Sequence, residues 1–172
     1  MVIGMMPGLI QRGWFDSLEP LNINDELREI AISLKQGGVD YALCDGLAVA
    51  LYGYPRATQD IDLLVEEPDL NRAVKVPENI GYTLSDGYIP FGPGENAQAR
   101  IYRISKAHGE ELLAVDLVLA SSVFNSIWVD RKTIPVEDYE LSVVSLEGLI
   151  KMKQLAGRPQ ERVDLHRLEE EE

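Results

Sequence analysis

The residues best suited to chemistry in this sequence are three aspartates that lie within apolar, strand-like segments. Asp60 and Asp62 stand one residue apart in DIDLLV, and Asp116 lies within LLAVDLVLA. Side chains at positions i and i+2 of a strand point to the same face, which puts the first two Cβ atoms roughly 6–7 Å apart. Two such carboxylates repel each other unless a cation lies between them. With the third carboxylate they form the oxygen ligand set that Mg²⁺ or Mn²⁺ prefers.

A simpler alternative places Asp60 and Asp62 at solvent-facing positions of a half-exposed strand. Aspartate is disfavoured in strands, however, and DIDLLV is otherwise strongly apolar. Asp116 repeats the anomaly in a second apolar segment. The sequence therefore favours a shared cation site.

A second candidate feature is the turn formed by Asp45 and Gly46, which follows the apolar segment YALC and precedes a short helical segment. A strand-to-helix turn offers free backbone N–H groups, which suit a phosphate, and glycine lets the ligand approach closely. The sequence contains neither GxxxxGK[ST] nor GxGxxG. A P-loop or dinucleotide-binding fold is therefore not supported.

Composition excludes several classes of protein. The 172 residues carry a formal net charge of −13, which disfavours non-specific binding of nucleic acid outside a local Lys/Arg cluster near the C-terminus. The single cysteine excludes an internal disulfide and a cysteine-rich zinc site. No apolar stretch approaches the ~20 residues that span a bilayer, and no leader is evident. We expect a single cytoplasmic domain, 1–172, without membrane association.

Hydrophobic periodicity and turn residues predict the elements that position these candidates. An arm over 1–22 precedes them, 77–97 is expected to be a long loop with at most a short strand near Tyr82, and 145–169 holds the C-terminal helices. Helices are expected at 24–36, 47–52, 68–76, 146–156 and 161–169, and strands at 41–44, 60–65, 98–104 and 111–119, with one or two edge strands within 133–144. This order predicts a small α/β (α+β) domain with a mixed sheet flanked by helices.

Together these features resemble the nucleotidyltransferase fold of the polymerase-β type, closest to small stand-alone bacterial members of the abortive-infection toxin and minimal nucleotidyltransferase groups. The family pattern is a strand, a glycine-containing turn, a helix, an Asp-x-Asp strand and a later acidic strand, matched here by Gly46, Asp60, Asp62 and Asp116. The C-terminal segment also resembles the end of these small members, and the resemblance as a whole covers about 24–168. Its matching residues are Leu149, Ile150, Lys153, Ala156, Gly157, Arg158, Pro159, Glu161, Asp164 and Leu165.

The resemblance implies Mg²⁺-dependent transfer of a nucleoside monophosphate from an NTP to an acceptor, which is a protein, an RNA end or a small molecule. The three aspartates are then the catalytic metal ligands. Arg56 and Thr58 are candidate phosphate contacts, with an exposed loop as the alternative. Lys153 and Arg158 are further candidates, with salt bridges to acidic residues of the last helix as the alternative.

One residue departs from the family pattern, because Asp45 stands where the family has glycine. At an effective dielectric constant of ~20, like charges ~5 Å apart cost on the order of 3 kcal/mol, which exceeds a hundredfold in affinity. Asp45 therefore turns away from the triphosphate, joins the metal site, or weakens NTP binding. The last outcome keeps an alternative function open: a catalytically weak or inactive binding module, such as a toxin–antitoxin component with an antitoxin partner or a homodimer.

Overall fold

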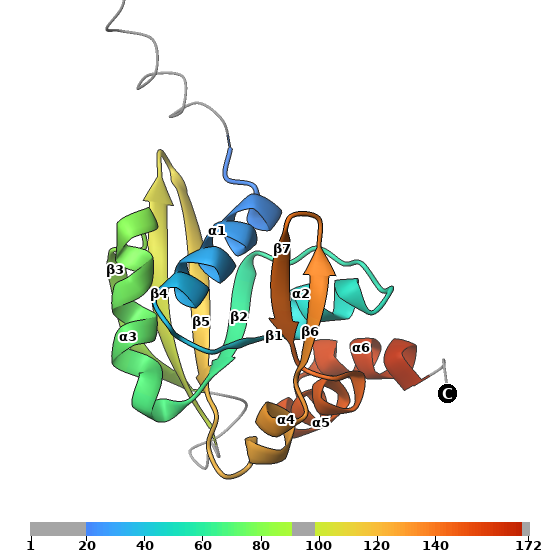
Figure 1. Cartoon of the computed structure of the whole chain (residues 1–172). Coiled ribbons are helices and arrows are strands. Elements are labelled where there is room, and N and C mark those ends of the chain that lie inside the picture. The colour runs from blue at the N-terminus through green and yellow to red at the C-terminus, as the bar shows by residue number, and fades with distance from the viewer. Residues whose placement is uncertain (1–19, 91–98, 170–172) are drawn as a thin grey trace, which may run out of the picture.

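A seven-stranded mixed sheet forms the centre of the computed structural model, which describes residues 20–90 and 99–169 (Figure 1). The strands run in the order β3-β4-β5-β2-β1-β7-β6, and two neighbouring pairs, β2–β5 and β1–β7, are parallel. Their bounds are β1 (Ala42–Cys44), β2 (Asp60–Val65), β3 (Leu84–Pro90), β4 (Arg100–His108), β5 (Glu111–Leu119), β6 (Lys132–Val136) and β7 (Tyr139–Val143). The mixed sheet and its flanking helices confirm the predicted fold class.

Six α-helices and two 3₁₀ turns accompany the sheet in the described part of the chain. They are α1 (Ile23–Gln36), α2 (Asp45–Leu51), η1 (Glu67–Asp69), α3 (Leu70–Lys75), η2 (Val76–Ile80), α4 (Asn125–Val129), α5 (Leu146–Ala156) and α6 (Pro159–Glu169). Of these described helices, none is long and apolar enough to cross a membrane. The predicted arm over 1–22 lies mostly outside the described residues.

The helices with the clearest sequence signals form as predicted. In α1 the apolar positions recur at helical spacing and are buried, namely Leu27, Ile30, Ala31 and Leu34. Helix α5 covers the predicted range, and the Ser145 side chain accepts a hydrogen bond from the backbone N–H of Gly148 at 3.1 Å. Gly157, at φ +62°, ends this helix in the left-handed conformation that glycine adopts without strain.

The expected long loop over 77–97 is wrong, because it contains the turn η2 and the seven-residue strand β3. This strand lies at the edge of the sheet and pairs only with β4. Leu84 and Tyr88 are exposed, and the pairing shifts register between Ser85 and Gly87. An exposed, bulged edge strand has no alternating apolar pattern, so hydrogen bonds to β4 and not local sequence define it. Residues 91–98 of the expected loop lie outside the described part.

The two faces of the sheet serve different purposes. Lys106 of β4 donates to Glu26 of α1 at 2.8 and 3.0 Å, and Glu26 also accepts from the Tyr82 hydroxyl at 3.0 Å. Residues an odd number apart on a strand face opposite sides, so Arg103 points away from α1. Helix α1 therefore covers one face of the sheet (Figure 1), and the candidate site is built on the other.

Candidate functional site

The strand register places the three aspartates on one face of the sheet. Asp62 lies directly opposite Asp116 on the neighbouring parallel strand β5, and Asp60 lies two residues before Asp62 on β2. Paired positions on adjacent strands point to the same side, as do positions i and i+2. All three line one cavity of about 420 Å³. The structure thus brings these predicted residues together, and their catalytic role stays a prediction.

Arg103, which the sequence did not single out, lies among these carboxylates. Arg103 of β4 is the register partner of Asp116 and donates two hydrogen bonds to it, at 2.7 and 2.8 Å. A third, longer contact of 3.4 Å reaches Asp60. A bidentate arginine–carboxylate pair is a strong, geometrically fixed interaction. Arg103 therefore supplies a positive charge between two of the predicted metal ligands.

Asp62 is left as the carboxylate without a counter-charge of its own. Burial, together with the charges of Asp45, Asp116 and Asp60, raises the pKa of Asp62 well above its usual range. Among the described residues, no hydrogen bond or ion pair reaches its carboxylate. Burial also raises the pKa of Asp60, although Arg103 opposes the shift. A cation at this position would relieve the repulsion.

The turn between β1 and α2 differs from a simple phosphate cradle. Helix α2 begins at Asp45, two residues before the predicted start, and Asp45 adopts φ +54°. This left-handed conformation costs a residue other than glycine roughly 1–2 kcal/mol. At Gly46 an added Cβ would lie 2.7 Å from Thr58 Oγ1 and 3.2 Å from a guanidinium nitrogen of Arg56. Glycine is therefore required here so that the loop carrying those two side chains can pack against the turn.

The carboxylate of Asp45 gathers the three predicted phosphate-binding cations. Its Oδ1 lies 2.8 Å from Lys153 Nζ and 3.2 Å from a terminal guanidinium nitrogen of Arg56, and its Oδ2 lies 3.1 Å from Arg158. Burial raises the pKa of Asp45, but the positive charges of Lys153, Arg158 and Arg56 lower it by more. The net effect is a pKa below the usual value. Asp45 therefore makes its ion pairs with the cations.

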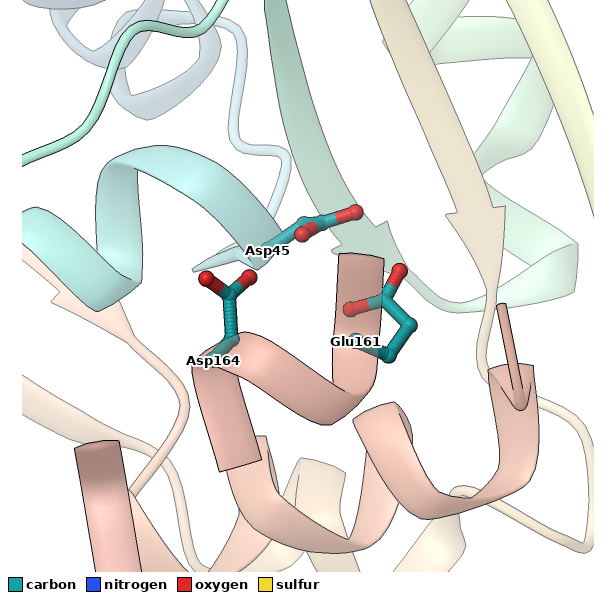
Figure 2. A group of neighbouring side chains, drawn as sticks. All are labelled: Asp45, Glu161 and Asp164. Atoms are coloured by element: carbon teal, nitrogen blue, oxygen red, sulfur yellow. The ribbon is translucent and has the colours of Figure 1, made fainter. Parts of the chain in front are cut away.

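Two acidic residues of α6 complete this cluster. Figure 2 shows Asp45 at the start of α2 facing Glu161 and Asp164. Oxygens from these three residues lie within 4.8 Å of one another, which makes them the group of described acidic residues spaced to hold a metal ion. Lys153 Nζ, however, lies 2.8, 2.6 and 2.8 Å from Asp45, Glu161 and Asp164 respectively. The ammonium already supplies the cation that this group needs, so we assign it as a buried ion-pair cluster.

Lys153 and Arg158 form the predicted salt bridges with the last helix, and their predicted role as phosphate contacts stays a prediction. Each lines the cavity, as a phosphate contact would, and each forms a salt bridge with α6. Arg158 lies 2.7 Å from Glu161, and Arg56 lies 3.2 Å from Asp164. Thr58 also lines the cavity, and its hydroxyl is 3.4 Å from the backbone oxygen of Asp60.

Asp60, Asp62 and Asp116 offer the donor chemistry that a divalent cation prefers, although among the described residues only the oxygens of Asp45, Glu161 and Asp164 are already gathered within 4.8 Å of one another. All three offer hard carboxylate oxygens, they share one face of the cavity, and the raised pKa of Asp62 marks an uncompensated negative charge. For all three to bind one ion, Arg103 would have to release or share Asp116, to which it donates two hydrogen bonds. The sequence signal for Arg103 was weak, because an arginine near the end of a predicted strand is an ordinary surface residue until the register is known.

The cavity also has an apolar wall. Ile89 of β3, Ile101 of β4 and Val118 of β5 line one side, and Leu149 and Met152 of α5 line another. Cavities that combine apolar walls with a few converging polar groups are the usual sites of small-molecule binding. The described part of the chain thus has a pocket with an acidic floor, a neutralised basic cluster and apolar sides.

Comparison with solved structures finds the same fold elsewhere. A nucleotidyltransferase-like protein from Thermotoga maritima (TM1012) is 16% identical, with a TM-score of 0.57 over 87% of this chain and 93% of the other. The lincosamide antibiotic adenylyltransferase LnuA, solved with lincomycin, gives 16% identity and a TM-score of 0.55 over 88% and 98%. ANT(2″)-Ia, solved with adenylyl-2″-tobramycin, gives 14% and 0.52 over 84% and 85%. Identities this low establish the fold alone.

The sequence comparisons assign the family. None of the curated proteins matches the sequence. A family model described as nucleotidyl transferase of unknown function (DUF2204) matches residues 23–171, which includes every described element of the site. The predicted resemblance is thereby confirmed, and the chain belongs to this family of nucleotidyl transferases.

Proposed function

We propose that the protein transfers a nucleoside monophosphate from an NTP to an acceptor in a reaction that depends on Mg²⁺ or Mn²⁺. The observation that carries the proposal is the register of Asp62 with Asp116, with Asp60 on the same face, across one cavity from a cluster of cations. In a member of a nucleotidyl transferase family, the acidic floor suits the metal and the cations suit the triphosphate.

The residues divide the work as follows. Asp60 and Asp62, together with Asp116, would hold the divalent ion, which would neutralise phosphate charge and lower the pKa of the acceptor hydroxyl. The acceptor oxygen attacks the α-phosphorus in line, the bond from that phosphorus to the bridging oxygen breaks, and pyrophosphate leaves. Asp116 accepts the acceptor proton once Arg103 moves toward the phosphate charge. Lys153, together with Arg56 and Arg158, then offsets the charge on the leaving pyrophosphate.

The acceptor is a small molecule or a protein in preference to an RNA end. A net charge of −13 opposes the approach of RNA, and the basic side chains of the cavity are already paired. LnuA and ANT(2″)-Ia, both of this fold, were solved with small molecules bound. The apolar wall formed by Ile89, Ile101 and Val118 gives such a molecule a surface to pack against. A cytoplasmic location belongs to the same proposal.

A second candidate function rests on a specific observation. Asp45 neutralises Arg56, Lys153 and Arg158, the cations that would otherwise attract a triphosphate. A protein with this arrangement fits a binding module with weak or no transfer activity, such as a toxin–antitoxin component or a homodimer subunit. The two candidates differ in whether bound NTP is consumed.

The test is incubation with each of the four NTPs, labelled at the α-phosphate, in Mg²⁺ or Mn²⁺ with a cell lysate. Transfer of label that Asp62→Asn abolishes, and that Asp138→Asn retains, supports the enzyme. Asp138 is a matched control, because it is an exposed carboxylate paired with Arg28 outside the cavity. NTP binding by calorimetry without label transfer supports the second candidate. The absence of both binding and transfer contradicts both.

A further inference from the structure

The arrangement around Asp45 resembles a bound anion held by converging cations. Arg56 comes from the loop between α2 and β2, Lys153 from α5, and Arg158 from the link between α5 and α6. All three direct a charged nitrogen at one carboxylate, at distances of 2.8 to 3.2 Å. Several cations from separate elements that meet at one group of oxygens are the arrangement that binds phosphate.

The backbone of Asp45 is held in an unfavourable conformation at this point. Asp45 has a φ of +54°. Among the described residues other than glycine, only Glu137 in the β6–β7 hairpin also has a positive φ. A residue other than glycine persists in this conformation where the surroundings hold it there. Three ion pairs anchor the Asp45 carboxylate in this conformation.

The three carboxylates around Lys153 are not equivalent. The side chains of Glu161 and Asp164 are 3% and 1% exposed, whereas Asp45 is 25% exposed and lines the cavity. If Asp45 swings away, Lys153 keeps its contacts of 2.6 and 2.8 Å to the two residues of α6. Asp45 is therefore the exchangeable anion, and the two acidic residues of α6 are the fixed ones.

The arginines show the same asymmetry. Arg158 keeps Glu161 at 2.7 Å, and Arg56 keeps Asp164 at 3.2 Å, when the Asp45 contact is lost. The six charged residues carry three positive and three negative formal charges, so the cluster has no net charge while Asp45 is in place. Removing the Asp45 carboxylate leaves a net positive charge of one next to the cavity.

We propose that the Asp45 carboxylate occupies the subsite that receives the polyphosphate of the ligand, and that the ligand binds by displacing it from Arg56, Lys153 and Arg158. Asp45 thereby sets the affinity of the protein for polyphosphate. The inference deepens the proposed function and rests on it only in naming an NTP as the physiological ligand. The chemistry that it requires is that of any condensed phosphate.

The test is calorimetric titration with inorganic tripolyphosphate in metal-free buffer at low ionic strength. Asp45→Asn keeps the shape of the side chain and removes its charge, so we expect it to bind about tenfold to a hundredfold more tightly than the wild type. Asp138→Asn makes the same change in net charge at an exposed ion pair, and we expect its affinity to stay within about twofold of the wild type. Equal or weaker binding by Asp45→Asn overturns the proposal, as does an equal gain in Asp138→Asn.

Two further measurements keep the test decisive if Asp45→Asn folds poorly. Asp45→Gly removes the backbone strain together with the charge, and the same gain in affinity is expected. In the wild-type chain, the carboxyl ¹³C resonance of Asp45 should shift on saturation with tripolyphosphate, because its three cation partners are lost. An unchanged resonance at saturation contradicts displacement.

The outcome is separable from that of the proposed function, because neither metal nor nucleotide is present. A gain in tripolyphosphate affinity without any nucleotidyl transfer supports the role of Asp45 and contradicts the enzyme. Transfer by the wild type, without a gain in the Asp45 variants, supports the enzyme and contradicts the role of Asp45.

Discussion

Asp62 has the least compensated charge in the cavity, and this property distinguishes a metal ligand from a structural residue. A carboxylate kept for stability is normally hydrogen-bonded or paired, because burial of an unpaired charge is costly. Asp62 is instead close to three other carboxylates, which together with burial raise its pKa. Such a position is unfavourable in the free protein, and a bound cation would make it favourable.

We therefore expect Asp62→Asn to abolish Mg²⁺ or Mn²⁺ binding while leaving the free energy of unfolding in metal-free buffer unchanged or higher by about 1 kcal/mol. Asp60→Asn should also abolish metal binding. Calorimetry measures the binding, and urea denaturation measures the stability. A clear loss of stability in both variants without metal would show that these aspartates are structural hydrogen-bond acceptors.

Arg103 is a second single residue with a testable role, because its guanidinium neutralises Asp116 in the free protein. Removing one partner of a buried pair typically costs 3–5 kcal/mol, and Arg103 is itself partly exposed. We expect Arg103→Met to lower the free energy of unfolding by about 2–3 kcal/mol in metal-free buffer, and Mg²⁺ to restore part of the loss. Urea denaturation with and without Mg²⁺ measures both effects.

Arg100 provides the control for this prediction, because it lies on the same strand and pairs with Glu67 at the surface. An exposed pair of this kind contributes about 0–1 kcal/mol, so Arg100→Met should change stability little and gain nothing from Mg²⁺. If Mg²⁺ fails to stabilise Arg103→Met more than the wild type, Arg103 does not compete with a metal for Asp116.

At the scale of elements, the buried ammonium of Lys153 connects helices α5 and α6 to the first residue of α2 through ion pairs. Lys153 of α5 is 2% exposed and contacts Glu161 and Asp164 of α6 as well as Asp45. Helix α6 has few buried apolar side chains, with Leu168 the clearest. Its position on α5 therefore depends heavily on these ion pairs.

We expect Lys153→Met to lower the free energy of unfolding by about 3 kcal/mol, because it removes the buried ammonium and leaves each of the two buried carboxylates of α6 with a single arginine partner. Amide hydrogen exchange should rise first in α6. Lys151→Met is the matched control, since Lys151 forms an exposed pair with Glu147 on the same helix and should contribute about 0.5 kcal/mol or less. Equal losses of unfolding free energy in the two variants would show that the ion pairs of Lys153 do not hold α6 in place.

The pH dependence of this difference is also defined. Burial lowers the pKa of Lys153, but Asp45 and the two carboxylates of α6 raise it, and the net shift is upward. A cation with a raised folded pKa contributes its stability fully below its unfolded pKa of about 10.4, and loses it as pH rises through the folded value. The stability gap between wild type and Lys153→Met should therefore stay constant from neutral pH to about pH 10.

At the scale of the whole molecule, the net charge of −13 controls which partners approach. The described cations that line the cavity are paired with carboxylates, so no basic face compensates the overall charge there. We expect no measurable binding of generic single-stranded or double-stranded RNA at physiological salt, which electrophoretic mobility shift can test. Binding in the micromolar range or tighter would contradict this expectation and would favour an RNA end as the acceptor.

The sequence by itself determined the elements whose signals are local. Regular apolar spacing defined α1 and α5, and the apolar run around Asp60 and Asp62 defined β2 at its observed bounds. The i, i+2 spacing placed these two aspartates on one face before any tertiary structure was known. The sequence analysis missed α4, which is too short for a periodic signal, and β3, an edge strand with exposed side chains such as Leu84 and Tyr88.

Only the tertiary structure decided how the charges are partnered. The turn after 100–108 makes β4 a neighbour of β5, but the sequence does not fix their register, so the pairing of Arg103 with Asp116 was known only from the structure. Likewise Asp45 and Lys153 are 108 residues apart, and only the packing of α5 against α2 brings them to 2.8 Å. Ion pairs depend on distance in space and not in sequence. The sequence therefore indicated which residues carry the chemistry, and the fold determined which of their charges are already neutralised.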